Sequence, residues 1–428
     1  MTIPEKMELK RELGLFEVTL SGIGIILGAG IYALIGKAAG LAGNSVWLSF
    51  AIAALIAVFT GLSYAELSSI FPKASAEYEY TSHAFGRRLA FVVGWLIIFS
   101  GVIGASTVAL GFGGYFDALT SVPVLISAVL LIFVLSLVLL WGIRISAWFA
   151  IVFTLIESAG LLIVIYVGIP HLGSVNYFEM PHGYSGVFEA AALIFFAYMG
   201  FEEMVKLSEE TRNPEKNIPL ALIIALVITI VLYILVAVSV VSVVPWEKLA
   251  ASEAPFAEVA AEALGADAFI VISVIALFAT ANTVLLMLLA ASRIAYGMAE
   301  SSSMPAILAK VHPVRRTPWV AILVVMLLSM VFVFSGDIAF VASANDFILF
   351  ATFIVINGGL IALRYKDPDR PRPFRVPLSI GRLPIPPVLG ILTCIFLIIH
   401  LDTAAILVGF GLALIGSILA FVCCRDAT

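Results

Sequence analysis

A glutamate stands at the middle of a long apolar run. Glu157 lies twelve residues from the start of the apolar stretch 145–170. A charged side chain at the centre of a bilayer costs several kcal/mol, so such a residue is a functional candidate by default. We expect Glu157 to carry a proton. A cation ligand, or a structural hydrogen bond to a neighbouring helix, are the alternatives.

Two apolar runs contain glycines that would interrupt a helix. The run SGIGIILGAGIY (21–32) contains Gly22, Gly24, Gly28 and Gly30, and the run FFAYMGFEE (195–203) contains Gly200. Each glycine inside a helix costs roughly 1 kcal/mol relative to alanine. An unwound backbone offers N–H groups to a carboxylate and carbonyls to an ammonium, so two such breaks suit a zwitterion. Close packing of small residues against another helix is the alternative.

Other polar side chains lie near these breaks in the sequence pattern. Thr280, Asn282 and Thr283, in the stretch 267–297, could face the first break and serve a cation or Glu157. Ordinary hydrogen bonds between helices are the alternative for these three residues.

Further carboxylates lie within apolar runs. Glu202 and Glu203 are consecutive and would point about 100° apart on a helix, so we expect only Glu202 to face the site. Glu66 is expected in packing or a polar network. Asp346 could stabilise an outer gate or pair with Lys37, or lie at a wetted helix end.

The composition requires a membrane. Hydrophobic residues make up 62% of the chain and charged residues 12%, whereas a soluble domain carries about 25% charged residues. We therefore predict a single all-α integral membrane domain, 1–424, because lipid offers no partner for unpaired backbone groups. Twelve stretches are long enough to span: 14–39, 45–71, 88–116, 122–142, 145–170, 186–207, 217–244, 267–297, 318–335, 338–363, 384–400 and 403–424.

The distribution of basic residues predicts the orientation. With the N-terminus in the cytoplasm, all but Lys37 and Lys248 of the 23 lysines and arginines fall on the cytoplasmic side, as the positive-inside rule requires. We expect a multi-pass protein of the cell membrane with both termini in the cytoplasm.

The two interrupted stretches are each the first of a set of five. The sets 14–170 and 186–363 run in opposite directions, which is the layout of an inverted five-plus-five repeat with its site at the breaks. The stretch 384–424 forms two accessory helices, and the basic, proline-rich loop 365–383 is expected to be a solvated linker.

Four runs resemble motifs of the amino acid–polyamine–organocation family, nearest to its cationic amino acid transporter branch. They are IILGAGIYALIG (25–36), YAELSSIFPKASAEYEYTSHAFG (64–86), FFAYMGFEEMVKLSEETRNPEKNIPLAL (195–222) and ATANTVLLMLLAASRIAYGMAESSSMPAILAKVHP (279–313). The resemblance implies a leucine-transporter-type fold with an amino acid held between the two interrupted helices.

The resemblance also implies roles for individual residues. The substrate carboxylate would bind the backbone N–H groups of Gly28, Ala29 and Gly30. The substrate amine would bind the carbonyls of Ile26, Phe196 and Met199. Phe196 and Phe201 would form an aromatic lid or pocket wall, and Glu202 would link the broken helix to its neighbours. Relatives often carry lysine where this chain has Glu157, which is a departure.

The function predicted is secondary active transport of amino acids, coupled to a proton. An exchanger or a sodium symporter is the alternative, and a channel or an intramembrane enzyme is remote. No His-Glu-x-x-His motif occurs, and the five histidines have no metal-ligand spacing, so we expect no metal, no cofactor and no enzyme activity. The expected partners are the substrate, the coupling ion and the lipid bilayer. Basic residues read as membrane anchors rather than as a nucleic-acid patch.

Overall fold

The computed structural model describes residues 11–423 apart from 74, 143–146 and 302–303. Its α-helices are α1 (Leu15–Leu27), α2 (Gly30–Ala42), α3 (Val46–Ile70), α4 (Ala76–Phe85), α5 (Arg87–Thr120), α6 (Val124–Trp141), α7 (Ala147–Gly168), α8 (Gly183–Ile194), α9 (Phe201–Met204), α10 (Pro214–Val243), α11 (Trp246–Ala251), α12 (Pro255–Leu264), α13 (Ala266–Glu300), α14 (Trp319–Val333), α15 (Ile338–Lys366), α16 (Ile385–Ile398) and α17 (Thr403–Cys423). Short 3₁₀ segments are η1 (Gly43–Ser45), η2 (Ile169–His171), η3 (Phe195–Tyr198), η4 (Val205–Glu210) and η5 (Ala306–Ala309).

Apolar helices dominate the described part of the chain. Nine segments of it are long and apolar enough to cross a membrane, and three shorter apolar helices accompany them: Leu15–Leu27, Trp319–Val333 and Ile385–Ile398. Every stretch predicted to span overlaps one or more of these segments, and several of the observed segments extend beyond the predicted bounds. The molecule is therefore a helical, multi-pass membrane protein, as its composition predicts.

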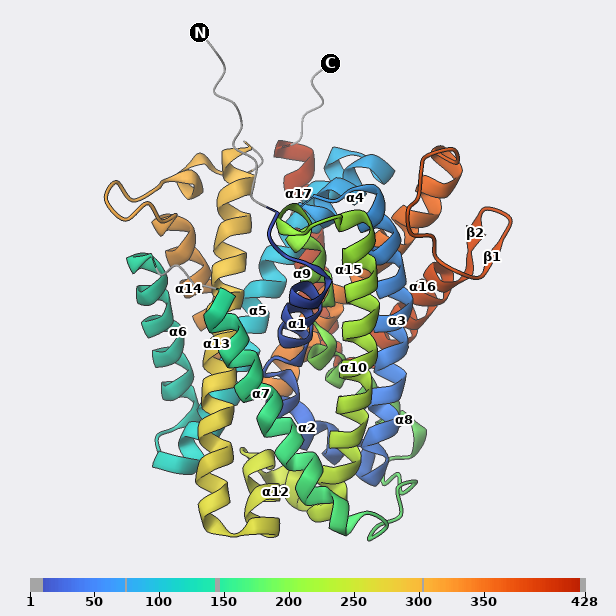
Figure 1. Cartoon of the computed structure of the whole chain (residues 1–428). Helices are drawn as coiled ribbons and strands as arrows, with labels where there is room; N and C mark the ends of the chain where they lie inside the picture. Colours follow the sequence, from blue (N-terminus) through green and yellow to red (C-terminus); the bar gives the residue numbers. More distant parts are fainter. Residues whose placement is uncertain (1–10, 74, 143–146, 302–303, 424–428) are drawn as a thin grey trace.

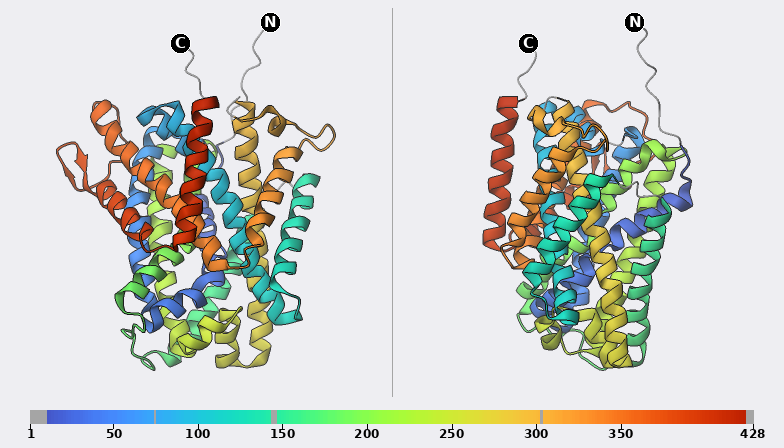
Figure 2. Two further views of the ribbon diagram at one scale, coloured as in Figure 1. Left: turned by 180° about the vertical axis from the view of Figure 1, so that it is seen from behind. Right: turned by 90° about the vertical axis from the view of Figure 1, so that its left-hand side faces the viewer.

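The helices pack as a bundle in which distant parts of the sequence lie side by side (Figures 1 and 2). The most extensive contacts join α5 to α13 and α3 to α10, and α14 packs on both α5 and α6. One large cluster of buried apolar side chains runs through these contacts. Lipid-facing side chains remain apolar, as on α6 and α17.

The two ends of the bundle differ. α4 and the short hairpin of β1 (Ser379–Ile380) and β2 (Leu383–Pro384) lie toward the end where α17 finishes, and α12 lies at the opposite end (Figure 1). The hairpin is antiparallel, with Ser379 opposite Pro384. We call these ends the α4 face and the α12 face.

A buried ion cluster fastens the loop after α15 to α3. Glu66 is fully buried and accepts hydrogen bonds from Arg364, from Arg372 at 3.1 Å and from the backbone N–H of Val376 at 2.7 Å. The prediction of a solvated linker holds for exposed Leu378 but is wrong for Val376, which is 2% exposed. The expected polar network at Glu66 is confirmed.

Candidate functional site

The first glycine run does interrupt a helix. α1 ends at Leu27, Gly28 leaves the helical conformation with ψ −177°, and α2 begins at Gly30. The predicted break is therefore confirmed for the second glycine pair. The first pair stays helical and serves close packing instead, since a Cβ on Gly24 would lie 1.9 Å from Thr154 Oγ1.

The second glycine run breaks in a different way. α8 tightens into η3, Met199 is extended with ψ 149°, and Gly200 has φ +112° before α9 begins. Such a positive φ is open to glycine and strained for other residues. A single glycine therefore sets the change of direction.

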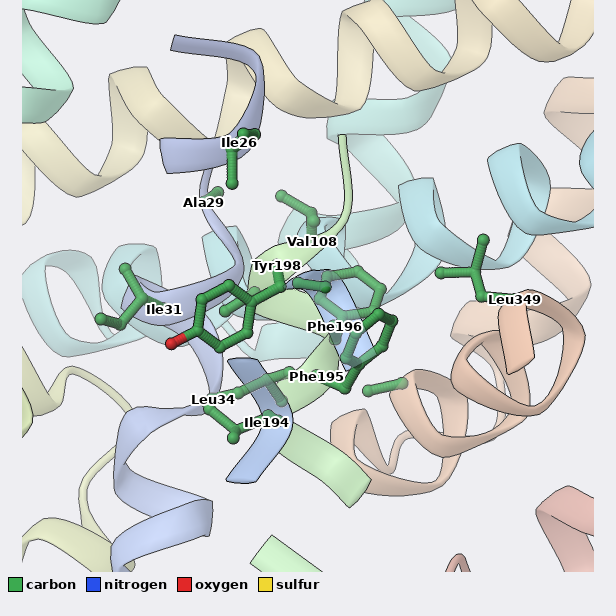
Figure 3. Close-up of a cluster of buried hydrophobic side chains, with 14 of the residues drawn as sticks. Ile26, Ala29, Ile31, Leu34, Val108, Ile194, Phe195, Phe196, Tyr198 and Leu349 are labelled. Carbon is green, nitrogen blue, oxygen red and sulfur yellow. The ribbon is translucent and has the colours of Figure 1, made fainter. Parts of the chain in front are cut away.

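The two breaks are in contact. A Cβ on Gly30 would lie 2.8 Å from Ala197 Cα, and one on Gly200 would lie 2.7 Å from the carbonyl oxygen of Ile25. Figure 3 shows Ile26 and Ala29 of the first break in one cluster with Phe196 and Tyr198 of the second. The glycines therefore permit both the breaks and their close approach.

Substituting Gly200 by alanine is expected to destabilise the fold by about 1–3 kcal/mol, because a side chain at this φ is strained and its Cβ would meet the Ile25 carbonyl oxygen. Thermal unfolding of the purified protein measures this. Gly411→Ala is the matched control, because a Cβ there meets nothing within 4 Å. Equal unfolding temperatures for the two variants would refute the role assigned to Gly200.

Side chains from two other helices satisfy the exposed backbone of the breaks. The Thr283 hydroxyl accepts a hydrogen bond from Ala29 N–H at 3.2 Å. The Tyr233 hydroxyl lies 2.8 Å from the Ile26 carbonyl oxygen and 2.9 Å from that of Ala197, so its one hydrogen is shared between the breaks. A carbonyl has two lone pairs, so Ile26 can still accept a bond from a substrate amine.

Sequence reasoning missed Tyr233. It lies in the apolar stretch 217–244, and its only signal is a hydroxyl within that stretch. Because it joins both breaks and is fully buried, it is part of the site's framework.

Tyr233→Phe is expected to cost about 1–3 kcal/mol of stability, because it leaves buried carbonyls at both breaks without their donor. The measurement is thermal unfolding in detergent, compared with Tyr166→Phe, whose ring is 72% exposed. If both variants unfold like the unmodified protein, the bridging role fails.

A cavity of about 420 Å³ lies beside the breaks. Of the residues predicted for the site, those lining it are Gly28, Met199, Glu202, Glu157, Asn282 and Thr283. Those packed outside its lining are Ile26, Ala29, Gly30, Phe196, Phe201 and Thr280. Thr280 bonds to the carbonyls of its own helix, Ala276 and Leu277. Most of the remaining wall is apolar, including Ile97, Leu286, Met287, Leu349 and Phe353.

Glu157 is one of three buried carboxylates that line this cavity, with Glu77 and Glu202. Its side chain is 2% exposed, and its Oε1 has no hydrogen-bond partner among the described residues. Asn282 lies near its carboxyl group, and the Tyr32 hydroxyl donates to its backbone carbonyl at 2.7 Å. The carboxyl group is thus neither ion-paired nor fully satisfied, and it borders the space a substrate would enter.

A second group of charges lies between the breaks and the α4 face. Glu202 Oε2 accepts a hydrogen bond from Gly200 N–H at 2.9 Å, which links the break to α9. Glu203 pairs with Lys206, and both glutamates line the cavity. The expectation that only Glu202 faces the site is therefore wrong. On α4, burial raises the pKa of the Glu77 carboxyl, against the opposing effect of Lys206.

The cavity continues toward the α4 face and is closed toward the α12 face. A second cavity of about 450 Å³ shares Glu77, Ile97, Lys206 and Ile294 with it. On the other side, Tyr32 packs edge-on against Phe256, with 4.8 Å between the ring centroids. The Tyr115 hydroxyl donates to the backbone carbonyl of Tyr32. Access to the breaks is therefore from the α4 side.

The comparisons with known proteins cover nearly the whole chain. The family described as amino acid permease matches residues 13–423. The branched-chain amino acid permease BcaP of Bacillus subtilis is 32% identical over 97% of this chain and 94% of its own. The methylthioribose transporter of the same species is 32% identical over 91% of this chain and 88% of its own. The vacuolar cationic amino acid transporter 4 of Arabidopsis thaliana is 29% identical over 87% of this chain and 65% of its own.

Proposed function

Since this chain belongs to the amino acid permease family, we propose that it carries amino acids across a membrane by alternating access, with the substrate held where α1–α2 and α8–α9 are interrupted. The chain is a membrane transporter and not an enzyme. The observation that carries the proposal is the contact between two glycine-broken helices beside a cavity.

The zwitterion of an amino acid fits the polarity of the breaks. Backbone N–H groups at Gly28, Ala29 and Gly30 stand at the start of α2, where the helix dipole favours a carboxylate. Carbonyls of Ile26, Phe196 and Met199 are the acceptors proposed for the amine. When a carboxylate binds, the Ala29 N–H would exchange its hydrogen bond to Thr283 for one to the carboxylate. Substrate binding would therefore free the Thr283 hydroxyl.

We propose a twelve-helix arrangement with an inverted repeat, 14–170 and 186–363, and two accessory helices in 384–424. The packing supports it, because at four of the five equivalent places the helices of the two halves meet each other, the exception being α7 and α15. The second helix of each half forms the pair α3 and α10, the third α5 and α13, and the fourth α6 and α14. The two broken helices complete the series.

The α4 face is proposed to be cytoplasmic, in the cell membrane. The basic loop after α15 and the end of α17 lie toward that face (Figure 2), as the positive-inside rule favours. On this assignment the cavity opens inward. Arg212 N–H bonds to the Leu13 carbonyl at 2.8 Å, so the segments beside the two broken helices are joined at their inner ends.

Coupling to a proton through Glu157 is proposed because this carboxylate borders the cavity and its Oε1 has no hydrogen-bond partner among the described residues. Exchange of one amino acid for another is the second candidate function. Sodium coupling is the further alternative, since unwound backbone carbonyls can coordinate Na⁺.

Neutral, apolar amino acids are the proposed substrates. Ile97, Met287, Leu349 and Phe353 give the cavity an apolar wall, and a similar protein is named a branched-chain amino acid permease. An apolar wall favours a side chain that loses water on binding.

A thermal-shift panel of the twenty amino acids on the purified protein tests this function. A ligand that binds only the folded state stabilises it by about 2.7 kcal/mol at one hundred times its Kd. Leucine, isoleucine and valine are expected to raise the unfolding temperature, and arginine and glutamate are not. Counterflow of radiolabelled leucine in liposomes then tests transport. No shift with any amino acid and no counterflow would reject the proposal.

A further inference from the structure

A buried carboxylate on α15 has no hydrogen-bond partner among the residues that the structure describes. Asp346 is 0% exposed, and neither of its carboxyl oxygens makes a hydrogen bond within the described part of the chain. Two of the three expectations for this residue are wrong: it is not at a wetted helix end, and Lys37 pairs with Glu253 at 3.5 Å instead. A role at an outer gate stays a prediction. A buried polar group without partners costs several kcal/mol, so this position needs an explanation.

Asp346 lies against the break in the second half of the chain. The backbone N–H of Phe196 is nearby without completing a hydrogen bond. The preceding residue, Asn345, donates from Nδ2 to Met199 Sδ at 2.9 Å, and its Oδ1 is also unpartnered. Figure 3 places Leu349 of the same helix in the cluster that holds Phe196. α15 therefore presents neighbouring polar side chains to both ends of the η3 break.

The groups around Asp346 favour a proton over a metal cation or a substrate ammonium as the species that binds its carboxylate. A hard metal cation takes about six or more oxygen ligands, whereas the group nearest to Asp346 is the backbone N–H donor of Phe196. The substrate amine is assigned instead to the carbonyls of Ile26, Phe196 and Met199, and Asp346 does not line the cavity. A proton needs only the carboxyl oxygen itself.

Several elements packed against α15 carry charged or titratable groups, and none of the described groups bonds to Asp346. These groups are Lys37, Glu66, Glu77, Glu79, His83, Arg87, Arg88, Asp117, Glu189, the tyrosines Tyr32, Tyr64, Tyr78, Tyr80, Tyr115, Tyr184 and Tyr198, and Cys394, with Asp337, Arg364, Tyr365 and Lys366 on α15 itself. Among the described residues none forms an ion pair or hydrogen bond with Asp346.

We propose that Asp346 binds a proton and exchanges it when the η3 break changes conformation. An ionised carboxylate here would need water or new donors, and the present packing of Phe196 and Met199 supplies neither. Movement of η3 would supply them. Proton occupancy and the conformation of the broken helix are then linked reciprocally. This inference rests on the proposed transport function and adds a second proton-binding position to Glu157.

The test uses the full chain in liposomes with L-leucine as the probe. Asp346→Asn keeps the shape and removes the ionisable group. We expect leucine counterflow at equal pH to stay within about twofold of the rate of the unmodified protein. Leucine accumulation driven by an acidic exterior is expected to fall about tenfold, which lies within the usual range of coupling between two sites. The matched control is Asp337→Asn at the N-terminus of the same helix, where the side chain accepts from Ala339 and Phe340 N–H and asparagine caps equally well.

The outcomes separate the two claims. Accumulation by Asp346→Asn equal to that of Asp337→Asn overturns the inference and leaves the proposed transport intact. Failure of the unmodified protein to exchange any amino acid overturns the transport proposal instead. If Asp346→Asn does not fold, the unmodified protein is treated with an apolar carbodiimide, which reacts with protonated carboxyl groups. Labelling of Asp346 that falls with rising pH supports the inference, and its absence at every pH overturns it.

Discussion

Glu157→Gln is expected to abolish accumulation of leucine driven by a proton gradient while leaving counterflow measurable. Glutamine keeps the size and polarity of the side chain, but it cannot gain or lose a proton. Glu157 is the carboxylate that borders the cavity with an unpartnered oxygen, so proton movement through it would stop. The reduction expected is about tenfold or more, which corresponds to at least 1.4 kcal/mol of coupling.

The measurement is uptake of radiolabelled leucine into liposomes under an imposed pH gradient, beside counterflow at equal pH. Glu247→Gln on α11 serves as the control, because that side chain is exposed and outside the cavity lining. Undiminished accumulation by Glu157→Gln would remove Glu157 from the coupling step. Loss of counterflow as well, with the fold intact, would instead indicate a role in binding.

Glu66→Gln is expected to destabilise the protein by about 3–5 kcal/mol, the usual cost of breaking a buried ion cluster from one side. Arg364 and Arg372 would keep their charges, with side chains 2% and 8% exposed, and lose the carboxylate between them. Glutamine keeps one acceptor oxygen instead of two, so either Val376 N–H or the arginine N–H groups at the other oxygen would lose their acceptor as well. The loop after α15 should then detach from α3.

Thermal unfolding in detergent measures the loss, and limited proteolysis of the loop reports detachment. Lys248→Gln is the comparison, since its pairs with Glu258 and Glu262 are at the surface, where such pairs contribute about 0–1 kcal/mol. Equal effects from the two substitutions would contradict the role assigned to Glu66. The combined Glu66→Gln and Arg364→Gln variant should recover part of the stability, because fewer buried charges remain unpaired.

The backbone framework of the site and its carboxylates differ in how far their polar groups are satisfied. Glycines let the backbones of the breaks meet, and hydroxyls of Tyr233 and Thr283 satisfy the groups that the breaks expose. The carboxylates Glu157 and Asp346 stand on opposite elements, α7 and α15, each lacking a partner for at least one oxygen. A site with a satisfied framework and unsatisfied carboxylates is suited to change its protonation without losing its fold.

Much of the architecture follows from the sequence because its causes are local. Mean hydropathy and the length of apolar runs locate the helices, since each span must satisfy its own backbone within lipid. The Gly28–Gly30 pair and Gly200 predict the breaks because glycine lowers helix stability at its own position. The same local rule could not separate Gly22 and Gly24 from Gly28 and Gly30: the first pair stays helical because Met204 and Thr154 pack against it, and those contacts are distant in sequence.

The sequence by itself therefore determined that Glu157 is a buried carboxylate in a helical membrane protein and where two of its helices are interrupted. The tertiary structure decided which polar groups have partners. It brought the Tyr233 hydroxyl to both breaks, closed the loop after α15 over Glu66, and left Asp346 without a hydrogen bond. Hydropathy depends on the neighbours along the chain, whereas the satisfaction of a buried polar atom depends on groups that folding brings within about 3 Å.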